Sequence, residues 1–205
     1  MIPGPTIIIS CPHCGQYAKK RTLISGNTFG AKLWSDGKKI APMLPDFPNL
    51  VVCSKCDQFY SVKNAKKIAE IKNSAELKEK YSNVEFIEFP TFYQYLKALE
   101  KIPDERYIRI RIWWSYNDYF RNDHENKITP DMHDLNAKNL LALLKLLDES
   151  DQNDLLMKAE ILRNLGWFEE SKLLLDRISD GDLAWVKEKF LVEINNQNKQ
   201  VFRLF

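Results

Sequence analysis

The sequence lacks a long apolar run and an excess of charge of one sign. No stretch approaches the roughly 18 consecutive apolar residues of a membrane helix, so no membrane association is expected. The N-terminal segment has no basic region, and its apolar run of three isoleucines, residues 7–9, is too short for a signal peptide, which predicts a cytoplasmic protein. The 30 basic and 28 acidic residues give a net charge of +2, which favours no particular partner.

The motifs that commonly carry catalysis are also missing. The segment 26–30 contains two glycines, but no Gly-Lys-Ser/Thr follows it, so it is not a phosphate-binding loop. There is no His-Glu-x-x-His pair and no recognisable nucleophile beside a base. The sequence therefore offers no support for an enzyme. Because 44% of the residues are apolar, it does predict a folded protein with a sizeable core.

All four cysteines fall into two Cys-x-x-Cys pairs, Cys11/Cys14 and Cys53/Cys56. Each pair forms a tight turn that directs two sulfurs at one point, and two such turns give a closed tetrahedral site of four sulfurs. In a reducing cytoplasm, paired cysteines indicate a metal rather than disulfides. We expect one structural Zn²⁺ bound by the four cysteines, with His13 facing solvent inside the first turn.

These two pairs resemble the zinc ribbon family over roughly the first 60 residues. The pairs are separated by the 38 residues 15–52, whereas a zinc ribbon usually has about 15–20. Each doubling of a loop costs only about 0.6 kcal/mol, so the long insert is expected to be a folded excursion. Residues 25–47 loosely resemble bacterial zinc-ribbon proteins that carry no assigned activity, and this likeness implies no catalytic residue.

The insert is predicted to consist of short strands and turns. Asp36-Gly37 indicates a hairpin, since both residues tolerate the positive φ of a type I′ turn. Three prolines in residues 41–48 exclude a helix there.

The first 80 residues have 13 basic and 6 acidic residues, a net of +7. Basic and aromatic residues together can bind nucleic acid, or they can form a solvated face over a small core. The candidate partner-binding residues of the insert are Lys19, Lys20, Arg21, Trp34, Lys38 and Lys39.

The remainder of the chain is predicted to be mainly helical. Residues 106–121 fit both a strand and a helix, although the Pro-Asp-Glu start signal at 103–105 favours a helix. Trp113 and Trp114 belong to an aromatic cluster that is either core or a partner-binding groove. The polar loop 121–134 contains His124 and His133, but no ligand spacing supports a second metal there.

Residues 152–185 indicate a helical hairpin, with Gly166 at its turn and the small residues Ala159 and Ser171 where two helices meet. This pattern resembles one tetratricopeptide (TPR) repeat. It departs from that pattern at Lys158, Ile178 and Leu183. A generic helical bundle remains the alternative.

The sequence therefore predicts an α+β protein, with a small β-rich zinc-ribbon module at residues 1–66 and an all-α, TPR-like domain at residues 67–205. The expected function is that of a zinc-binding, non-enzymatic interaction or adaptor protein with a protein partner. The alternative is a nucleic-acid-associated protein that uses the basic zinc-ribbon face.

Overall fold

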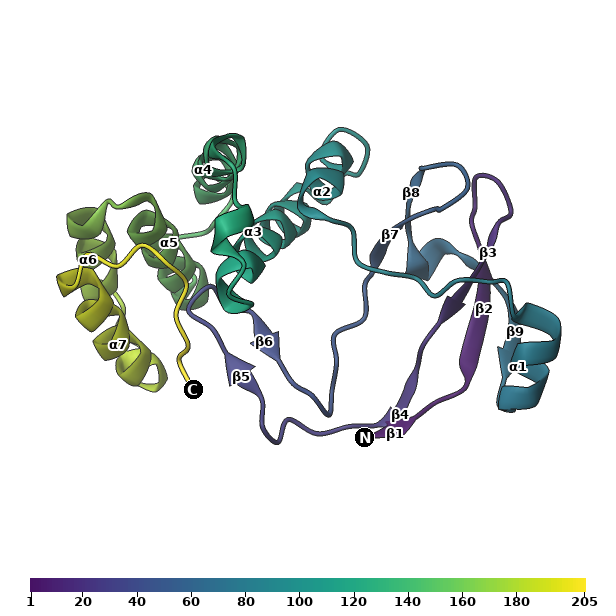
Figure 1. Cartoon of the computed structure of the whole chain (residues 1–205). Helices are drawn as coiled ribbons and strands as arrows, with labels where there is room; N and C mark the ends of the chain where they lie inside the picture. Colours follow the sequence, from purple (N-terminus) through teal and green to yellow (C-terminus); the bar gives the residue numbers. More distant parts are fainter. The chain divides into compact units, whose positions relative to one another are not determined.

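The computed structural model describes residues 1–205, with the exception of the side chain of Ser74. The chain forms two compact units (Figure 1). Unit 1 comprises Met1–Ala31 and Ile40–Ile102, and unit 2 comprises Lys32–Lys39 and Pro103–Phe205. The units therefore do not divide at residue 66, and part of the insert between the cysteine pairs belongs to unit 2.

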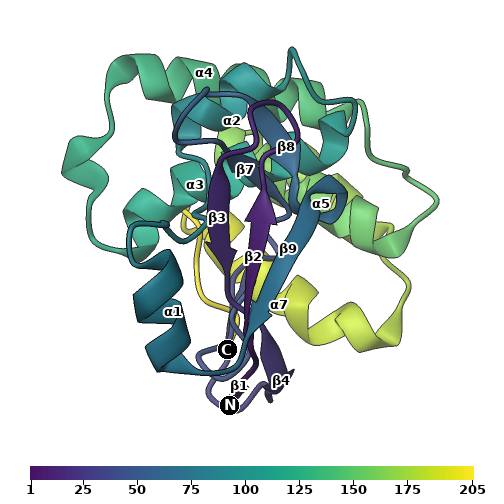
Figure 2. The same ribbon diagram turned by 90° about the vertical axis from the view of Figure 1, so that its right-hand side faces the viewer.

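Unit 1 is built on a small antiparallel sheet in which β2 (Thr6–Ser10) lies between β3 (Tyr17–Lys20) and β9 (Lys66–Ile71) (Figure 2). Ile8 and Ile9 of this central strand are buried. A register shift lies opposite them in β9, where Ile8 pairs with Ala69 and Ile9 with Lys67. Such bulges on edge strands discourage pairing with other chains.

Shorter elements complete unit 1. The segment after the sheet pairs with β3, because Lys19 donates its N–H to Glu85 at 2.7 Å and accepts the N–H of Ile87 at 2.9 Å. Thr91 caps the last helix of the unit with a capping box. The remaining elements are β1 (Ile2–Pro3), β4 (Leu23–Ser25), β7 (Leu50–Val52), β8 (Phe59–Ser61), α1 (Ser74–Tyr81) and α2 (Phe92–Ala98).

Unit 2 contains α3 (Glu105–Arg121), α4 (Pro130–Leu144), α5 (Gln152–Leu165), α6 (Phe168–Asp176) and α7 (Ala184–Asn195). The ambiguous segment 106–121 is a helix, and the side chain of Asp104 caps it by accepting the N–H of Tyr107. The chain is thus of mixed α and β structure. None of the described helices is long and apolar enough to cross a membrane.

The helices of the C-terminal half are joined in unit 2 by a strand pair that the prediction had placed with the zinc-ribbon module, because the β5–β6 hairpin (Lys32–Leu33 and Lys39–Ile40) supplies Lys32–Lys39 to this unit. The C-terminal segment pairs with this hairpin: Leu204 donates its N–H to Leu33 at 2.8 Å, and Ser35 donates to Phe202 at 2.9 Å. A local hairpin signal cannot reveal which unit the hairpin joins.

The hairpin turn also differs from the predicted type I′ turn. Of the two central residues that were expected to have positive φ, only Gly37 does, at +78°. Gly37 donates its N–H to the carbonyl of Trp34 at 2.9 Å, and Trp34 donates to Lys38 at 3.0 Å. This pattern matches a longer class of hairpin loop than the two-residue type I′ loop, in which a turn is followed by a glycine in the left-handed conformation.

The helical hairpin α5–α6 forms as predicted. Gly166 ends α5 with a left-handed φ of +84°. Ala159 is fully buried, and its carbonyl accepts the hydroxyl of Ser171 at 2.7 Å. The far ends also meet, because Ser179 donates its N–H to Gln152 at 2.9 Å. The two helices are therefore antiparallel and closely packed around small residues.

Enlarging the buried alanine is expected to destabilise unit 2. Ala159→Leu places three extra carbons where Ser171 contacts the backbone, and overpacking of this kind costs about 1–3 kcal/mol. Urea denaturation followed by tryptophan fluorescence measures the change. Lys172→Leu, which adds a leucine at an exposed position of α6, is the control. An unfolding free energy equal to that of the parent would contradict close packing at Ala159.

Candidate metal centre

The four predicted cysteine ligands lie together in unit 1. Their Sγ atoms are all within 4.8 Å of one another, with Cys11–Cys56 at 3.9 Å and Cys14–Cys53 at 3.6 Å. Tetrahedral coordination with metal–sulfur bonds of about 2.3 Å requires sulfurs about 3.8 Å apart. The four cysteines are therefore within metal-binding distance and fit one tetrahedral ion.

The two cysteine turns have the same backbone design. The carbonyl of Cys11 accepts the N–H of Gly15 at 2.9 Å, and the carbonyl of Cys53 accepts the N–H of Asp57 at 2.9 Å. Gly15 has a φ of +75° and Asp57 a φ of +54°. Aspartate is one of the few residues with a side chain that adopt this conformation readily. Both turns therefore present their two sulfurs in the same way.

The sequence itself contains this repeat, as Cys-x-x-Cys-Gly-Gln at residues 11–16 and Cys-x-x-Cys-Asp-Gln at residues 53–58. The glutamine carbonyls accept the N–H of the first cysteine in each turn, at 2.8 Å for Gln16 and 3.0 Å for Gln58. The two turns leave the strands β2 and β7 and lead into β3 and β8. Two strand pairs thus hold the ligands.

His13 lies outside the group of four. It is exposed, as predicted, and its Nε2–H donates to the carbonyl of Phe59 at 3.2 Å. This hydrogen bond links the first cysteine turn to β8. Beneath the cysteines, a small core excludes water, and it consists of Ile9, Val51, Tyr60 and Val62 together with Cys11 and Cys53 themselves.

Hydrogen bonds from backbone N–H groups lower the pKa values of Cys53 and Cys56, whereas burial raises them. Burial raises the pKa of Cys53, but hydrogen bonds from the N–H groups of Lys55 and Cys56 outweigh it and lower the pKa to about 7. The N–H of Gln58 lowers the pKa of Cys56, but burial and the three neighbouring thiols raise it to about 12. The group therefore resists full deprotonation by itself, whereas a bound divalent cation stabilises all four thiolates.

His124 and His133 do not belong to a cluster of metal-ligating side chains in the described structure. Among the described residues, the only group of three or more close metal-ligating side chains is that of the four cysteines. Helix α4 begins at Pro130, earlier than the predicted loop allows, because Thr129 caps it. His133 therefore lies on the helix, where its Nδ1 is hydrogen bonded to the hydroxyl of Tyr116.

The predicted basic face is divided between the two units. Lys19, Lys20 and Arg21 lie in unit 1, whereas Trp34, Lys38 and Lys39 lie in or next to the β5–β6 hairpin of unit 2.

Several of these side chains already have partners within the protein. Lys19 is buried with its Nζ 5.4 Å from the centre of the Phe86 ring, and Arg21 stacks on the same ring at 4.4 Å. Lys38 is paired with Asp118 at 2.6 Å. Because of these contacts, fewer basic side chains are available to bind the phosphate groups of a nucleic acid.

Tight binding of nucleic acid at physiological salt is therefore not expected. Fluorescence anisotropy with a labelled single-stranded oligonucleotide measures it. The control is a variant in which Lys20 and Lys39 are changed to alanine. A sub-micromolar complex that weakens steeply with salt and is lost in this variant would contradict the expectation, because released counterions are the signature of phosphate contacts.

The two candidate tryptophans of α3 have structural contacts. Trp113 is fully buried, and its Nε1–H donates to Asn164 Oδ1 at 2.9 Å. Trp114 is half-buried, and its Nε1–H donates to the carbonyl of Asp36 at 2.9 Å. Both therefore hold unit 2 together, and Trp113 offers no surface to a partner.

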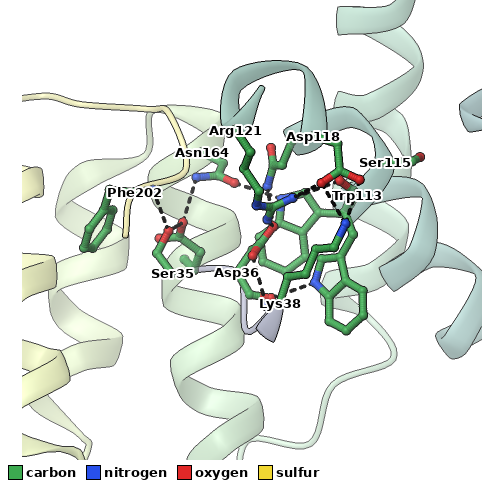
Figure 3. A network of polar contacts seen from close by, with 12 residues as sticks. Ser35, Asp36, Lys38, Trp113, Ser115, Asp118, Arg121, Asn164 and Phe202 are labelled. Atoms are coloured by element: carbon green, nitrogen blue, oxygen red, sulfur yellow. Dashed lines mark hydrogen bonds and ion pairs between the residues drawn. The ribbon is translucent and has the colours of Figure 1, made fainter. Parts of the chain in front are cut away.

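The structure also contains a buried polar network that sequence reasoning missed (Figure 3). Asp36 of the hairpin accepts hydrogen bonds from Asn117 at 2.8 Å and from Arg121. The side chains of Asp36 and Arg121 are 0% and 1% exposed. Arg121 also reaches Asp118 at 2.8 Å. Arg121, in the last turn of α3, thus neutralises the buried negative charge of Asp36 in the hairpin.

The same network continues to α5. Ser35 donates its hydroxyl to Glu160 Oε1 at 2.6 Å, and Arg163 donates to both carboxylate oxygens of Glu160, at 2.6 and 2.7 Å. Glu160 and Arg163 are fully buried. Arg163 also donates to the carbonyl of Gln200 at 2.9 Å. This pair ties α5 to the hairpin and to the C-terminal segment.

No protein-family model, curated protein or solved structure matches this chain.

Proposed function

We propose that the chain is a non-enzymatic interaction protein whose unit 1 is built around one structural Zn²⁺. The observation that carries the proposal is the convergence of Cys11, Cys14, Cys53 and Cys56 within 4.8 Å. Four thiolates in tetrahedral geometry suit zinc. The four cysteines would fill all four coordination positions of the ion. Because no position would be left for a substrate, the ion would have a structural role.

Metal analysis tests this assignment. We expect one zinc per chain in protein purified without added metal, and about none in Cys53→Ser. Ser54→Ala, an exposed neighbour, is the control and should retain the metal. Iron in place of zinc, or thiols that resist alkylation because they are paired as disulfides, would refute the proposal.

The interaction role rests on the exposed apolar side chains of unit 2. Leu173 of α6 is 66% exposed, Trp185 and Val192 of α7 are 41% and 56% exposed, and Trp167, which precedes α6, is 45% exposed. Large exposed apolar residues of this kind, aromatics above all, are enriched where proteins bind partners. The close α5–α6 hairpin with Ala159 and Ser171 at its contact supports the TPR-like interpretation of this region.

Affinity capture from the native host, with and without nuclease, tests the role. A protein partner is expected to survive nuclease and to be lost from Leu173→Glu, which places a charge at the most exposed of these four side chains. Leu173→Ala is the milder companion variant. Partners that disappear with nuclease and persist with Leu173→Glu would instead favour the alternative, a nucleic-acid-associated protein that uses Lys20, Arg21 and Lys39.

A further inference from the structure

Unit 1 has a group of exposed apolar side chains that none of the roles above uses. They belong to three segments, residues 1–6, 22–31 and 40–45. We call this group the apolar tip, and its members are Ile2, Ile24, Phe29 and Leu44, which are 55%, 72%, 84% and 44% exposed. Figure 2 shows β1 and β4, which carry Ile2 and Ile24, opposite the end of β2 from which the first cysteine turn leaves. The apolar tip therefore lies away from the metal site.

Backbone contacts hold the segments of the apolar tip together. Ile2 pairs with Ser25 between β1 and β4. A Cβ atom at Gly26 would collide with the carbonyl oxygen of Met43 and would lie 3.0 Å from Cδ1 of Leu44. Only glycine allows this approach, which brings the segment after β4 against the segment after β6. The three segments therefore meet in the folded unit.

The most exposed member of the apolar tip, Phe29, lies in a defined turn. Its N–H donates to Asn27 Oδ1 at 3.0 Å, and Ala31 donates its N–H to the carbonyl of Thr28 at 3.0 Å. Gly30 supplies the left-handed φ of +70° that such a turn requires. The loop thus presents a phenylalanine ring to water, although such exposure is unfavourable. Exposed apolar side chains that gather in this way mark sites where a protein binds a partner or a membrane.

The accessible charge that borders the apolar tip is positive. In a chain with 28% charged residues, none of the three segments has a charged side chain. The charged residues next to these segments in the sequence are Arg21, Lys32, Lys39 and Asp46. All four are exposed, but Asp46 already interacts with another residue of the protein. An uncharged apolar tip bordered by cations suits an anionic surface.

We propose that unit 1 docks onto an anionic phospholipid surface through the apolar tip. Ile24 and Phe29 enter the boundary between headgroups and acyl chains, and the bordering basic side chains contact the anionic headgroups. Such binding gains from the apolar area that leaves water and from attraction to anionic lipids. A protruding turn needs no complementary cavity in a fluid lipid layer, whereas a protein partner would have to provide a packed pocket for Phe29.

This contact differs from a membrane-spanning one. None of the described helices could cross a membrane, and the expectation of no membrane association rested on the lack of a spanning segment. Binding at the surface requires no such segment. The inference goes beyond the proposed interaction role, because it uses neither the cysteines nor the helices of unit 2.

Sedimentation of the full chain with lipid vesicles tests the docking. The probes are vesicles of phosphatidylcholine alone and vesicles of equal parts phosphatidylcholine and phosphatidylserine. We expect binding to the anionic vesicles that weakens as salt is added, because salt screens the attraction. Phe29→Ser should lower the partition coefficient about tenfold, since the ring no longer leaves water. Tyr93→Ser removes another exposed aromatic of unit 1, outside the apolar tip, and should bind as the parent does.

Two further variants separate the apolar and the charged contributions. Ile24→Ser, on β4 rather than in the turn, should weaken binding to both kinds of vesicle. Lys32→Gln should weaken binding to the anionic vesicles about fivefold and leave binding to phosphatidylcholine unchanged. Failure of the parent to bind anionic vesicles, or equal binding of Phe29→Ser and Tyr93→Ser, would overturn the inference. A concentration-dependent dimer that Phe29→Ser abolishes would also overturn it, because the apolar tip would then bind a second copy of the chain.

Discussion

Cys53→Ser is expected to unfold unit 1 and to leave unit 2 folded. A structural zinc ion contributes about 10–16 kcal/mol of apparent binding free energy, which is coupled to folding. The core beneath the cysteines cannot replace this contribution, because it is small and includes Cys53 itself. Unit 2 has its own core, in which Leu155, Ala159, Leu175 and Phe190 are buried together.

The distribution of tryptophan makes this prediction easy to measure. All five tryptophans, Trp34, Trp113, Trp114, Trp167 and Trp185, belong to unit 2. Their fluorescence should therefore report a thermal transition that Cys53→Ser does not change. Hydrogen exchange followed by mass spectrometry should show loss of protection in residues 1–31 and 40–102.

Ser54→Ala is the control for this experiment and should behave as the parent. A tryptophan transition that shifts by as much as unit 1 does would contradict the expected independence. It would show instead that the hairpin at residues 32–39 transmits the loss of the metal.

Asp36→Ala is expected to destabilise unit 2 by about 3–5 kcal/mol, because it leaves the fully buried guanidinium of Arg121 without its closest carboxylate. The substitution also removes the acceptor for Asn117. The hairpin would lose the contact that joins its turn to α3. Urea denaturation followed by tryptophan fluorescence measures the loss.

Asp118→Ala provides the comparison, because Asp118 is the second carboxylate partner of Arg121 and its side chain is 34% exposed. Solvent screens such a pair, so we expect a cost of about 1 kcal/mol. The two variants compare the buried carboxylate partner of Arg121 with the partly exposed one, which also pairs with Lys38. Equal losses would show that Asp36 contributes no more than a surface ion pair.

The features that depend on a few neighbouring residues could be predicted from the sequence. The Cys-x-x-Cys spacing directs two sulfurs at one point, and the four cysteines do converge. Asp36-Gly37 indicates a reversal of the chain, and Gly166 ends a helix where a left-handed residue is needed. These predictions succeeded because backbone preference acts locally, within one turn of chain.

The positions of these local features within the folded units could not be predicted from the sequence, because they depend on contacts between residues far apart in the chain. Asp36 meets Asn117, and Ser35 meets Glu160, 81 and 125 residues further along the chain. No spacing rule predicts such pairs, because burial of a charge is stable only when a partner from elsewhere neutralises it. Long-range packing also buries Trp113 and pairs Lys38 with Asp118. For the same reason, the hairpin belongs to unit 2 although its residues lie between the two cysteine pairs in the sequence.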